Sequence, residues 1–577
     1  MNFEEGLVKT KKIKKRKVIK RNNDLNYLII KDRKGKSIIR KIVYSRVIGN
    51  FLLIILQILI IALFVLRLER YLEYYFGISI VLSAACLVYL SNCKTKNEFK
   101  IAWMAPLMIM PLFAIIAYLI YHTNWSQYRI GKKLKKIDEE LKSYNPKPEL
   151  AEKTLKNYPE VLGLGKYLLN LGGYFPSDDS RLTYYKSGEV FFPVLIEELK
   201  KAEEFIFIEF FILEVDDSWG EILKILEQKA KKGVNIRVLC DGFGSPMASS
   251  KSYQKYMKEH GIDFKVFLPL IPFFSTHLNN RDHRKIVVVD GKVAFTGGVN
   301  ISNEYFNRDH KRFAYWKDNA VKIEGQAIQN LTAMFLQTWN ISSTSKENYE
   351  KYLKRNYDFF NSQEIVAQKE DNQKGSTQEE STQEKITQEG KTQKKRGLLI
   401  PYGDDVFNQE DIAESVYLYI INNAKKYLYI TTPYMIIDNQ LQDALIFAAK
   451  RGVDVKIIVP DVYDHFLTFC IGKTYLKTLV DNGICINLYK KGFIHEKTFV
   501  CDDKIATVGS INLDYRSLFH HFECGVLIYK NDSIKEIKAD VENTLSESSP
   551  MEKKDYKKLP LHYRLIGRML RIFSPLL

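Results

Sequence analysis

Three long apolar stretches occupy residues 47–66, 74–90 and 101–121. The first has the roughly 20 residues that a bilayer-spanning helix needs, and the second is shorter. The third contains two prolines, which spanning helices tolerate better than soluble ones. A signal peptide would be shorter, would lie nearer the start and would end at small residues. The pattern predicts a transmembrane anchor over residues 47–121, with two or three spans.

Beyond the anchor, a strand–helix–strand pattern occurs twice. AEEFIFIEFFI (202–212) corresponds to AKKYLYITTPYMI (424–436), and KKGVNIRVLCD (231–241) corresponds to KRGVDVKIIVPD (450–461). In the second pair a glycine ends a helix and a buried strand follows. A repeat spaced by about 200 residues indicates two related lobes and not a solenoid. We therefore expect a membrane-anchored α/β protein with two homologous lobes, each a β-sheet flanked by helices, over residues 185–365 and 398–545.

The remaining segments have distinct compositions. Residues 1–46 form a basic arm, 122–184 a connector, and 366–397 a TQE-rich insertion that has almost nothing to bury and is expected to be disordered. The tail, residues 546–577, ends in LPLHYRLIGRMLRIFSPLL, where basic residues alternate with apolar ones at helical spacing. This amphipathic tail could lie on a membrane surface or pack against the second lobe.

Charge is concentrated near the start of the chain. The formal net charge is +18, and residues 1–46 hold 16 Lys or Arg against four acidic residues, a net of +12. A nucleic-acid-binding protein more often spreads positive charge over its folded body. The arm could be a nuclear localisation or nucleic-acid patch, but next to a membrane span we favour attraction to anionic lipid headgroups.

The orientation of the anchor has two readings. The positive-inside rule places the arm and the loop with Lys94, Lys96 and Lys100 in the cytoplasm, so three spans would leave the lobes outside. Seven scattered cysteines without a CxxC pair indicate free thiols and a reducing compartment. Two spans, with a re-entrant or interfacial middle stretch, would reconcile both observations and place the lobes on the cytoplasmic side.

Each lobe ends its pattern with a His-Lys-Asp strand. HRKIVVVD begins at His283 and HEKTFVCD at His495, and each is followed six residues later by Gly-x-x-Asn. Strand alternation places His283 beside Lys285 and His495 beside Lys497. Two core histidines next to solvated lysines would be the structural alternative. The motif occurs at corresponding places in both lobes, which favours a catalytic role for its histidines and lysines.

A pair of imidazoles and a pair of ammonium groups suits phosphodiester chemistry. One imidazole attacks phosphorus, and the other protonates the leaving oxygen and later takes a proton from the incoming alcohol. The lysines, with Asn300, Asn512 and Ser510, would bind the phosphate oxygens. No metal or other cofactor is expected, because the lysines supply positive charge. A metal site formed by His520, His521, Glu523 and Cys524 is disfavoured because adjacent strand residues face opposite ways. Each lobe would thus contribute one histidine to a shared site.

The duplicated HxKxxxxDxxxxxxG(G/S)xN pattern is similar to that of the phospholipase D superfamily, and the chain closely resembles bacterial cardiolipin synthases. TGGVN, ITTPYMIIDNQLQDAL, HEKTFVCDDKIATVGSINLDYRS and RMLRIFSPLL carry the resemblance. The long basic arm, the TQE insertion and Asp282 are departures from it. The resemblance implies that two phosphatidylglycerol molecules give cardiolipin and glycerol through a phosphohistidine, with His283 as nucleophile and His495 as general acid and then base.

Four carboxylates complete the expected site. Asp290 and Asp502, counted with the catalytic motifs, have strand parity opposite to the histidines and are expected to anchor the motifs more than to touch substrate. The superfamily orients each histidine with a downstream carboxylate, and the resemblance makes Asp318 and Glu523 the candidates.

Other functions share these motifs. A phospholipase D would give the intermediate to water, phosphatidylethanolamine could be the donor, and a scaffold would carry a dead site. A nuclease or nucleic-acid-binding module is disfavoured by the spans and the modest charge of the body. The expected partners are phosphatidylglycerol, other anionic phospholipids and the bilayer, without nucleic acid. We expect a multi-pass protein of the bacterial cell membrane.

Overall fold

The computed structural model describes residues 72–122, 125–269, 280–310, 312–341, 347–353, 396–407 and 410–576, with a few single positions besides. The basic arm, nearly all of the TQE insertion and most of the first predicted span, 47–66, lie outside the described residues.

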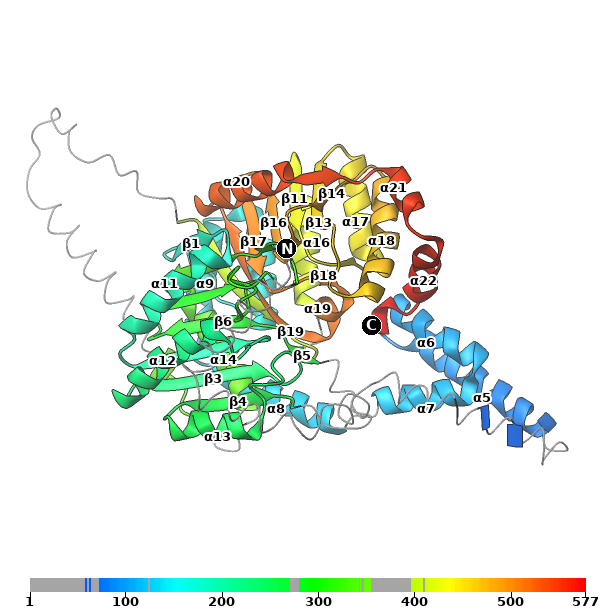
Figure 1. The fold of residues 1–577 in the computed structure, drawn as a ribbon, viewed down its shortest axis with the longest axis horizontal. Coiled ribbons are helices and arrows are strands. Elements are labelled where there is room, and N and C mark those ends of the chain that lie inside the picture. The colour runs from blue at the N-terminus through cyan, green and yellow to red at the C-terminus, as the bar shows by residue number, and fades with distance from the viewer. Residues whose placement is uncertain are drawn as a thin grey trace, which may run out of the picture.

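Two mixed sheets form the body of the protein (Figure 1). Their strands are the apolar runs of the sequence. In both sheets, the strands that come from the N-terminal half of each lobe are parallel to one another. The first sheet has the order β1 (Arg181–Tyr185), β9 (Ala320–Glu324), β7 (Val293–Gly297), β6 (Lys285–Val289), β2 (Phe205–Phe210), β3 (Asn235–Asp241) and β4 (Asp263–Phe267).

The second sheet repeats this order. It runs β10 (Leu398–Asp404), β19 (His521–Tyr529), β17 (Ile505–Gly509), β16 (Thr498–Cys501), β11 (Tyr427–Thr431), β13 (Asp454–Pro460), β14 (Cys485–Tyr489) and β20 (Ser548–Pro550). The first seven strands match those of the first sheet one by one, so the predicted pair of α/β lobes is confirmed. The sheets reach slightly further than predicted, because β1 begins inside the expected connector and β20 follows residue 545.

Helices cover the outer faces of both sheets. Lobe 1 has α11 (Gly188–Lys201), α12 (Asp217–Lys231) and α13 (Lys251–Glu259), and lobe 2 has α16 (Ile412–Asn423), α17 (Asn439–Lys450) and α18 (Phe466–Asp481). A hydrophobic cluster shared by both lobes lies between the sheets. It joins side chains of both sheets with those of α14 (Ile328–Ile341), α20 (Ser533–Ser546) and α8 (Trp125–Lys142). This shared core fixes one lobe against the other.

The two predicted helix-ending glycines lie where the sequence indicates. Gly233 and Gly452 follow the ends of α12 and α17 and have φ values of +86° and +95°. An L-residue side chain is unfavourable in this left-handed region, which is why glycine stops these helices. Each turn then leads directly into a buried strand, β3 or β13.

Two short strands cross from one lobe to the other. β5 (Arg281–Asp282) pairs with β19 of lobe 2, and β15 (Phe493–Ile494) pairs with β8 (Trp316–Lys317) of lobe 1. The prediction of one continuous strand through each motif was therefore wrong. Each motif histidine lies between a crossing strand and the central strand, β6 or β16, because the chain bends there to reach the partner lobe.

The described N-terminal region contains α5 (Leu72–Asn92), α6 (Asn97–Ile109) and α7 (Pro111–His122). The predicted span over residues 101–121 is divided at Met110. Pro111 starts the second helix and has no N–H to continue the first, which explains the break. Within the described residues, no helix combines the length and apolar character that crossing a bilayer requires.

The tail forms α21 (Lys553–Lys558), α22 (Leu561–Arg571) and a short 3₁₀ turn, η4 (Ser574–Leu576). α22 packs along α18, so the tail contacts the second lobe. η4 reaches α6, and the end of the chain therefore lies beside the N-terminal helices (Figure 1).

Candidate active site

Each motif histidine is held by the backbone of the other lobe. The His283 N–H donates to the Phe522 carbonyl of β19 at 2.9 Å, directly after β5 has paired with that strand. The His495 N–H donates to the Lys317 carbonyl of β8 at 2.7 Å, directly after β15. The exchange of short strands thus brings both histidines to the boundary between the lobes.

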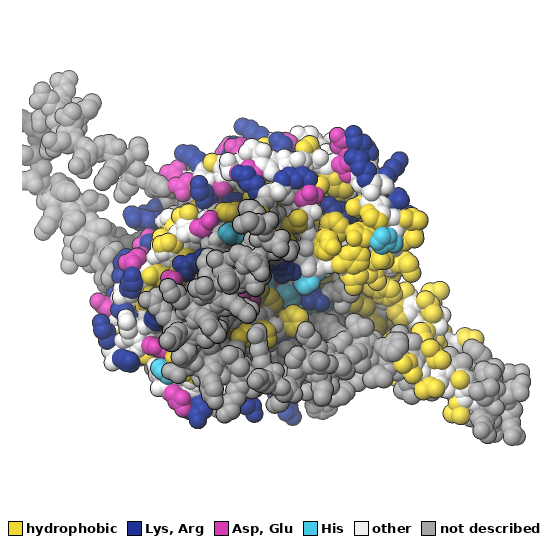
Figure 2. All heavy atoms as spheres, viewed as in Figure 1, with side chains coloured by type: hydrophobic (Ala, Val, Ile, Leu, Met, Phe, Trp, Pro, Cys, Tyr) yellow, Lys and Arg dark blue, Asp and Glu magenta, His cyan; other side chains and the backbone are white. Residues whose placement is uncertain are grey.

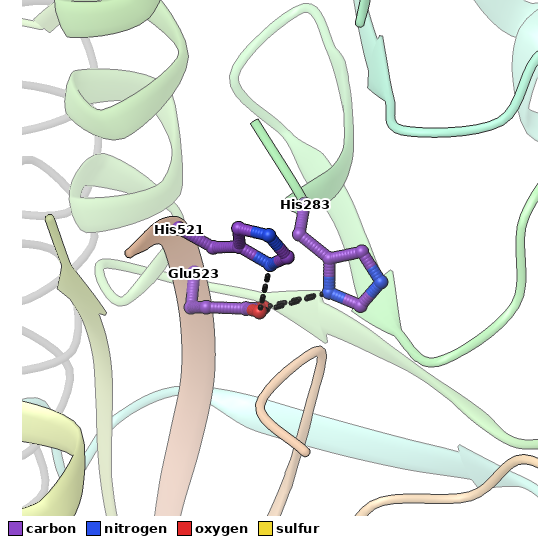
Figure 3. Close-up of side chains that lie close together, drawn as sticks. All are labelled: His283, His521 and Glu523. Atoms are coloured by element: carbon purple, nitrogen blue, oxygen red, sulfur yellow. Dashed lines mark hydrogen bonds and ion pairs between the residues drawn. The ribbon is translucent and has the colours of Figure 1, made fainter. Parts of the chain in front are cut away.

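The same exchange places a buried carboxylate against each imidazole. His283 Nδ1 lies 2.9 Å from Glu523 Oε1, and His495 Nδ1 lies 2.6 Å from Asp318 Oδ2. Both carboxylates are fully buried. Figure 3 shows the His283 ring with its Nδ1 toward Glu523. Because Nδ1 is engaged, Nε2 is the nitrogen available for chemistry in both rings.

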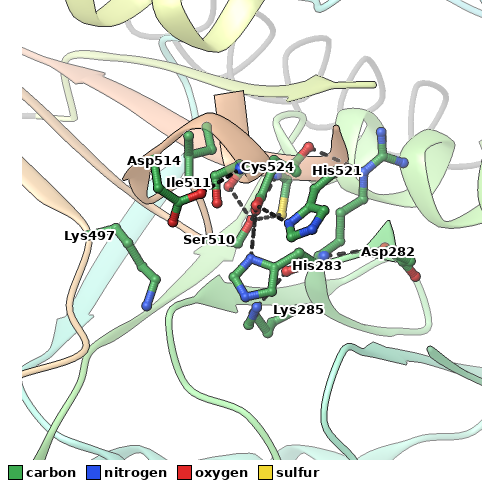
Figure 4. A network of polar contacts seen from close by, with 12 residues as sticks. Asp282, His283, Lys285, Lys497, Ser510, Ile511, Asp514, His521 and Cys524 are labelled. Carbon is green, nitrogen blue, oxygen red and sulfur yellow. Dashed lines mark hydrogen bonds and ion pairs between the residues drawn. The ribbon is translucent and has the colours of Figure 1, made fainter. Parts of the chain in front are cut away.

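The motif lysines come from different lobes but share one electrostatic environment. Burial lowers the pKa of Lys285 to about 8 and that of Lys497 to about 7, and the Lys285 charge further lowers the Lys497 pKa. Lys285 Nζ donates to the His283 carbonyl at 2.5 Å, and Lys497 Nζ lies 2.8 Å from His495 Nδ1. Figure 4 shows both lysines reaching the region of His283. The lobes therefore build a single site.

Burial also governs the histidines and their carboxylates. It lowers the pKa of His283 to about 3 and that of His495 well below its usual value, so both rings are neutral at pH 7. Burial opposes ionisation of Glu523, but its interactions with His283, the hydrogen bond with His521 and the charge of Lys285 outweigh burial and hold the Glu523 pKa well below its usual range. Burial raises the pKa of Asp318 to about 7, against the pull of Lys497. The two carboxylates are thus electrostatically unequal.

The two predicted phosphate-binding asparagines are buried in corresponding positions. Asn300 Oδ1 accepts a hydrogen bond from the Ile212 N–H at 3.1 Å, and its Nδ2 makes no hydrogen bond of good geometry within the described residues. In Asn512 the atom assigned as Oδ1 likewise lacks a partner there. Each amide keeps an unused polar atom, which a phosphate oxygen or a lipid hydroxyl could satisfy.

Ser510 does not have the surroundings expected of a phosphate ligand. Its hydroxyl donates to Glu523 Oε2 and accepts from the Cys524 N–H at 3.0 Å. In lobe 1 the corresponding residue is Gly298, where a Cβ would lie 2.0 Å from Asp318 Oδ1. The Ser510 hydroxyl thus holds the carboxylate behind His283, and phosphate binding by this residue stays a prediction.

Asp290 and Asp502, counted with the catalytic motifs, lie at the far ends of their strands. Asp290 accepts hydrogen bonds from three consecutive N–H groups, at residues 203–205, each at 2.8 Å. Asp502 accepts from the N–H groups of residues 425–427 at 2.7–2.9 Å. Both side chains tie the motif to the start of the neighbouring strand, so they belong to the scaffold and not to the reacting centre.

His521 lies in the site, although the sequence pattern indicated for it only a disfavoured metal site. Its ring centroid lies 5.6 Å from that of His283, and its Nδ1 lies 3.5 Å from Glu523 Oε1 (Figure 3). Two residues apart on β19, His521 and Glu523 share a face, a signal overlooked when adjacent residues were considered. The ligand atoms of His283, His521 and Glu523 lie within 4.8 Å of one another, so the cluster could hold a metal ion. Glu523 already binds His283 and Ser510, which suits an orienting carboxylate equally well.

Aromatic side chains enclose the imidazoles. Phe211 lies edge-on to His283 with ring centroids 4.9 Å apart, and Tyr305 and Trp316 lie 5.4 and 5.5 Å from His495. These rings help to bury the imidazoles, and burial is the first cause of the lowered histidine pKa values.

Comparisons with known proteins agree with this architecture. The family model described as "Cardiolipin synthase, PLD-like domain" matches residues 195–339 and 417–545, one segment in each lobe. An uncharacterized protein of Streptococcus mutans is 38% identical over 85% of this chain and 99% of its own length. Cardiolipin synthase 2 of Bacillus anthracis is 31% identical over 85% of this chain and 89% of its own length. A cardiolipin synthase of Geobacillus sp. is 30% identical over 92% of this chain and all of its own length.

A solved structure shares the fold at low sequence identity. Phosphatidylserine synthase of Haemophilus influenzae superposes with a TM-score of 0.51 and 16% identity, covering 72% of this chain and 99% of that one. The near-complete match of that protein supports the two-lobe arrangement. With relatives at 30% identity or more over most of their length, the chain belongs to the cardiolipin synthase family of phospholipase D-like proteins.

Proposed function

We propose that this protein is a cardiolipin synthase that joins two phosphatidylglycerol molecules and releases glycerol. The observation that carries the proposal is the pairing of two neutral, carboxylate-bound histidines from different lobes across one lysine-lined site. Membership in the cardiolipin synthase family makes it a phosphatidyltransferase.

In the first half of the reaction, His283 Nε2 attacks the phosphorus of one phosphatidylglycerol. The bond from phosphorus to the glycerol headgroup oxygen breaks, and His495 donates the proton that this oxygen needs to leave. His495 is neutral in the lipid-free protein, and an anionic phosphate beside it favours its protonated form. The ionised Glu523 stabilises the positive charge that His283 acquires in the phosphatidyl-histidine. This supports His283 as the nucleophile.

In the second half, a hydroxyl of another phosphatidylglycerol attacks the same phosphorus. His495 takes the hydroxyl proton, the new P–O bond forms, and the P–N bond to His283 breaks to release cardiolipin. Lys285 and Lys497 hold the non-bridging oxygens through both steps, and Asn300 and Asn512 can contribute amide contacts. The residues present thus account for the charge balance of the reaction.

The substrate chemistry also supports a place at the bacterial cell membrane. Phosphatidylglycerol is an anionic bilayer lipid, and the apolar stretches at residues 47–121 with the basic arm before them suit a multi-pass anchor whose lobes face the cytoplasm. Phosphatidylglycerol, other anionic phospholipids and the bilayer are then the partners of the protein, and no nucleic acid is involved.

Product analysis with one labelled lipid tests the proposal. Full-length protein in detergent is incubated with phosphatidylglycerol alone, and we expect cardiolipin with an equal amount of free glycerol. Phosphatidic acid as the main product would make water the acceptor and the protein a phospholipase D. Turnover only after phosphatidylethanolamine is added would reassign the donor. His283→Ala should abolish turnover while leaving membrane insertion intact.

A further inference from the structure

The outward face of α22 is apolar, although this helix lies on the surface of lobe 2. Leu561, Leu565, Met569 and Ile572 recur at helical spacing and are 63%, 48%, 70% and 47% exposed. A surface helix of a globular protein ordinarily turns its apolar stripe toward the core. In α22 the stripe points away from the protein that the helix packs on.

Contacts with α18 fix α22 in this orientation. Gly567 lies against α18 so closely that a Cβ would be 2.2 Å from the Cys470 carbonyl oxygen. The Arg571 guanidinium lies over the Tyr475 ring at 4.1 Å and donates to Thr478 Oγ1 at 3.3 Å. A glycine and an arginine therefore make the packed side, and the apolar stripe cannot rotate inward without breaking these contacts.

The stripe belongs to a larger apolar area. Val462, Tyr463 and Leu467, at the start of α18, are 42%, 46% and 49% exposed. Figure 2 shows hydrophobic side chains gathered over α18 and α22 and continuing toward α6 and α5. Leu576 links the two regions, because it packs against the hydrophobic cluster of the N-terminal helices. The area thus continues the apolar surface of the predicted anchor.

The charge beside the stripe is positive. α22 contains Arg564, Arg568 and Arg571 and no acidic residue, and α21 before it ends in two lysines. An exposed apolar stripe flanked by basic side chains is the arrangement of a helix that lies in the headgroup region of an anionic bilayer. A soluble protein partner would not require this continuity with the anchor.

The area also lies near the catalytic site. An open pocket is lined by Val462 and Tyr463 of the exposed turn and by Phe493. The Phe493 ring centroid lies 6.3 Å from that of His495. The nearness of this pocket to the general acid suits a lipid whose acyl chains stay near the bilayer while its phosphate enters the site.

We infer that α22 and the turn at residues 462–467 form a docking surface for an anionic lipid bilayer. The apolar stripe enters the boundary between headgroups and acyl chains, and Arg564 and Arg568 bind lipid phosphates, so this side of lobe 2 is held at the lipid surface. The link to substrate entry rests on the proposed function, whereas the docking itself does not.

Quenching by brominated lipids tests the docking directly. Met569→Trp is compared with Val190→Trp, which adds a tryptophan at an exposed apolar position (47%) on α11, at the opposite end of the molecule in Figure 1. Both full-length variants are placed in vesicles of phosphatidylglycerol and brominated phosphatidylcholine. We expect the added Met569→Trp fluorescence to be quenched and the added Val190→Trp fluorescence to be retained. Equal quenching of the two would overturn the inference.

A kinetic comparison separates docking from catalysis. The double substitution Leu565→Glu and Met569→Glu should raise KM for phosphatidylglycerol in vesicles by about tenfold, because two apolar contacts are lost and negative charge is added. Turnover of short-chain, monomeric phosphatidylglycerol should stay near the wild-type rate, and Val190→Glu should affect neither substrate. Loss of both activities in the double variant, or a changed oligomeric state in sedimentation, would refute lipid docking. Absence of cardiolipin synthesis in the wild type would refute the proposed function while leaving the quenching result valid.

Discussion

At the scale of single residues, the site depends on what lies behind each imidazole. Glu523 lies on β19 of lobe 2 but binds His283, while Asp318 follows β8 of lobe 1 but binds His495. A residue at the corresponding position of each lobe contacts the carboxylate: the Ser510 hydroxyl donates to Glu523, and Gly298 has no side chain that would collide with Asp318. Each histidine is therefore supported from the lobe that does not carry it.

Replacing Glu523 by glutamine should lower kcat by about 10²-fold or more, because the amide cannot stabilise a positively charged His283. The measurement is cardiolipin formation from phosphatidylglycerol under saturating conditions. Glu542→Gln, at an α20 residue whose side chain is 52% exposed, is the matched control and should behave as the wild type. A Glu523→Gln enzyme with kcat close to the control would remove this carboxylate from the mechanism.

The lysines predict the alkaline side of the pH profile. Burial lowers the pKa of Lys285 to about 8 and that of Lys497 to about 7, so rising pH removes the positive charges that bind the phosphate. We expect kcat/KM to fall as pH rises through this range. Lys497→Arg, which stays charged, should move the fall to higher pH even if its maximum is lower. An unchanged midpoint in this variant would show that other groups set the profile.

At the scale of elements, the crossing strands position the chemistry. β5 and β15 are each only two residues long, yet each ends directly before a motif histidine and fixes its backbone on the partner lobe. Gly492, just before β15, allows the close approach, because a Cβ there would lie 2.0 Å from the Tyr315 carbonyl oxygen. Pairing of β15 with β8 thus depends on the absence of a side chain.

Gly492→Ala should separate β15 from β8 and so displace His495. Because catalysis is sensitive to small displacements of reacting groups, we expect kcat to fall by about 10²-fold. The far-UV circular dichroism should be unchanged, because two residue pairs are a small part of the sheets. Gly220→Ala, inside α12 where nothing lies within 4 Å of the added Cβ, is the control. Equal activity of the two variants would contradict the role given to the crossing strands.

The sequence predicted the long elements better than the short ones. Apolar runs and helix-ending glycines such as Gly233 identified the main strands and their repeat, since these signals are local. The crossing strands could not be recognised in the same way, because two residues carry no periodicity and their partners are distant, with His283 and Glu523 240 residues apart. Family resemblance, and not pattern, pointed to Glu523, while the surroundings of Ser510 appeared only in three dimensions.

At the scale of the whole molecule, the lobes form one body. Besides the shared hydrophobic core, Asp540 of α20 accepts hydrogen bonds from two lobe 1 residues, Lys317 and Tyr184, both at 2.7 Å. Lys317 also pairs with Glu496 at 2.5 Å. These groups are buried, so the ion cluster fixes the relative position of the lobes and hence of the two histidines.

Asp540→Asn should lower the free energy of unfolding by about 3 kcal/mol, because it removes one partner of a buried ion pair. Asp555→Asn, in a solvent-exposed pair with Lys558, should cost no more than about 1 kcal/mol. Unfolding of both variants in urea, in the same detergent, compares them. A loss for Asp540→Asn no larger than that for the control would mean that the cluster does not hold the lobes together.

The central claim, that one lobe supplies the nucleophile and the other the acid and base, is tested most directly by locating the covalent intermediate. Wild-type protein is mixed with phosphatidylglycerol labelled at phosphorus, quenched in alkali to preserve phosphohistidine, digested and mapped by mass spectrometry. We predict label on His283 in the wild type and none in His283→Ala. Label on His495, or rapid glycerol release without any labelled histidine, would contradict the account.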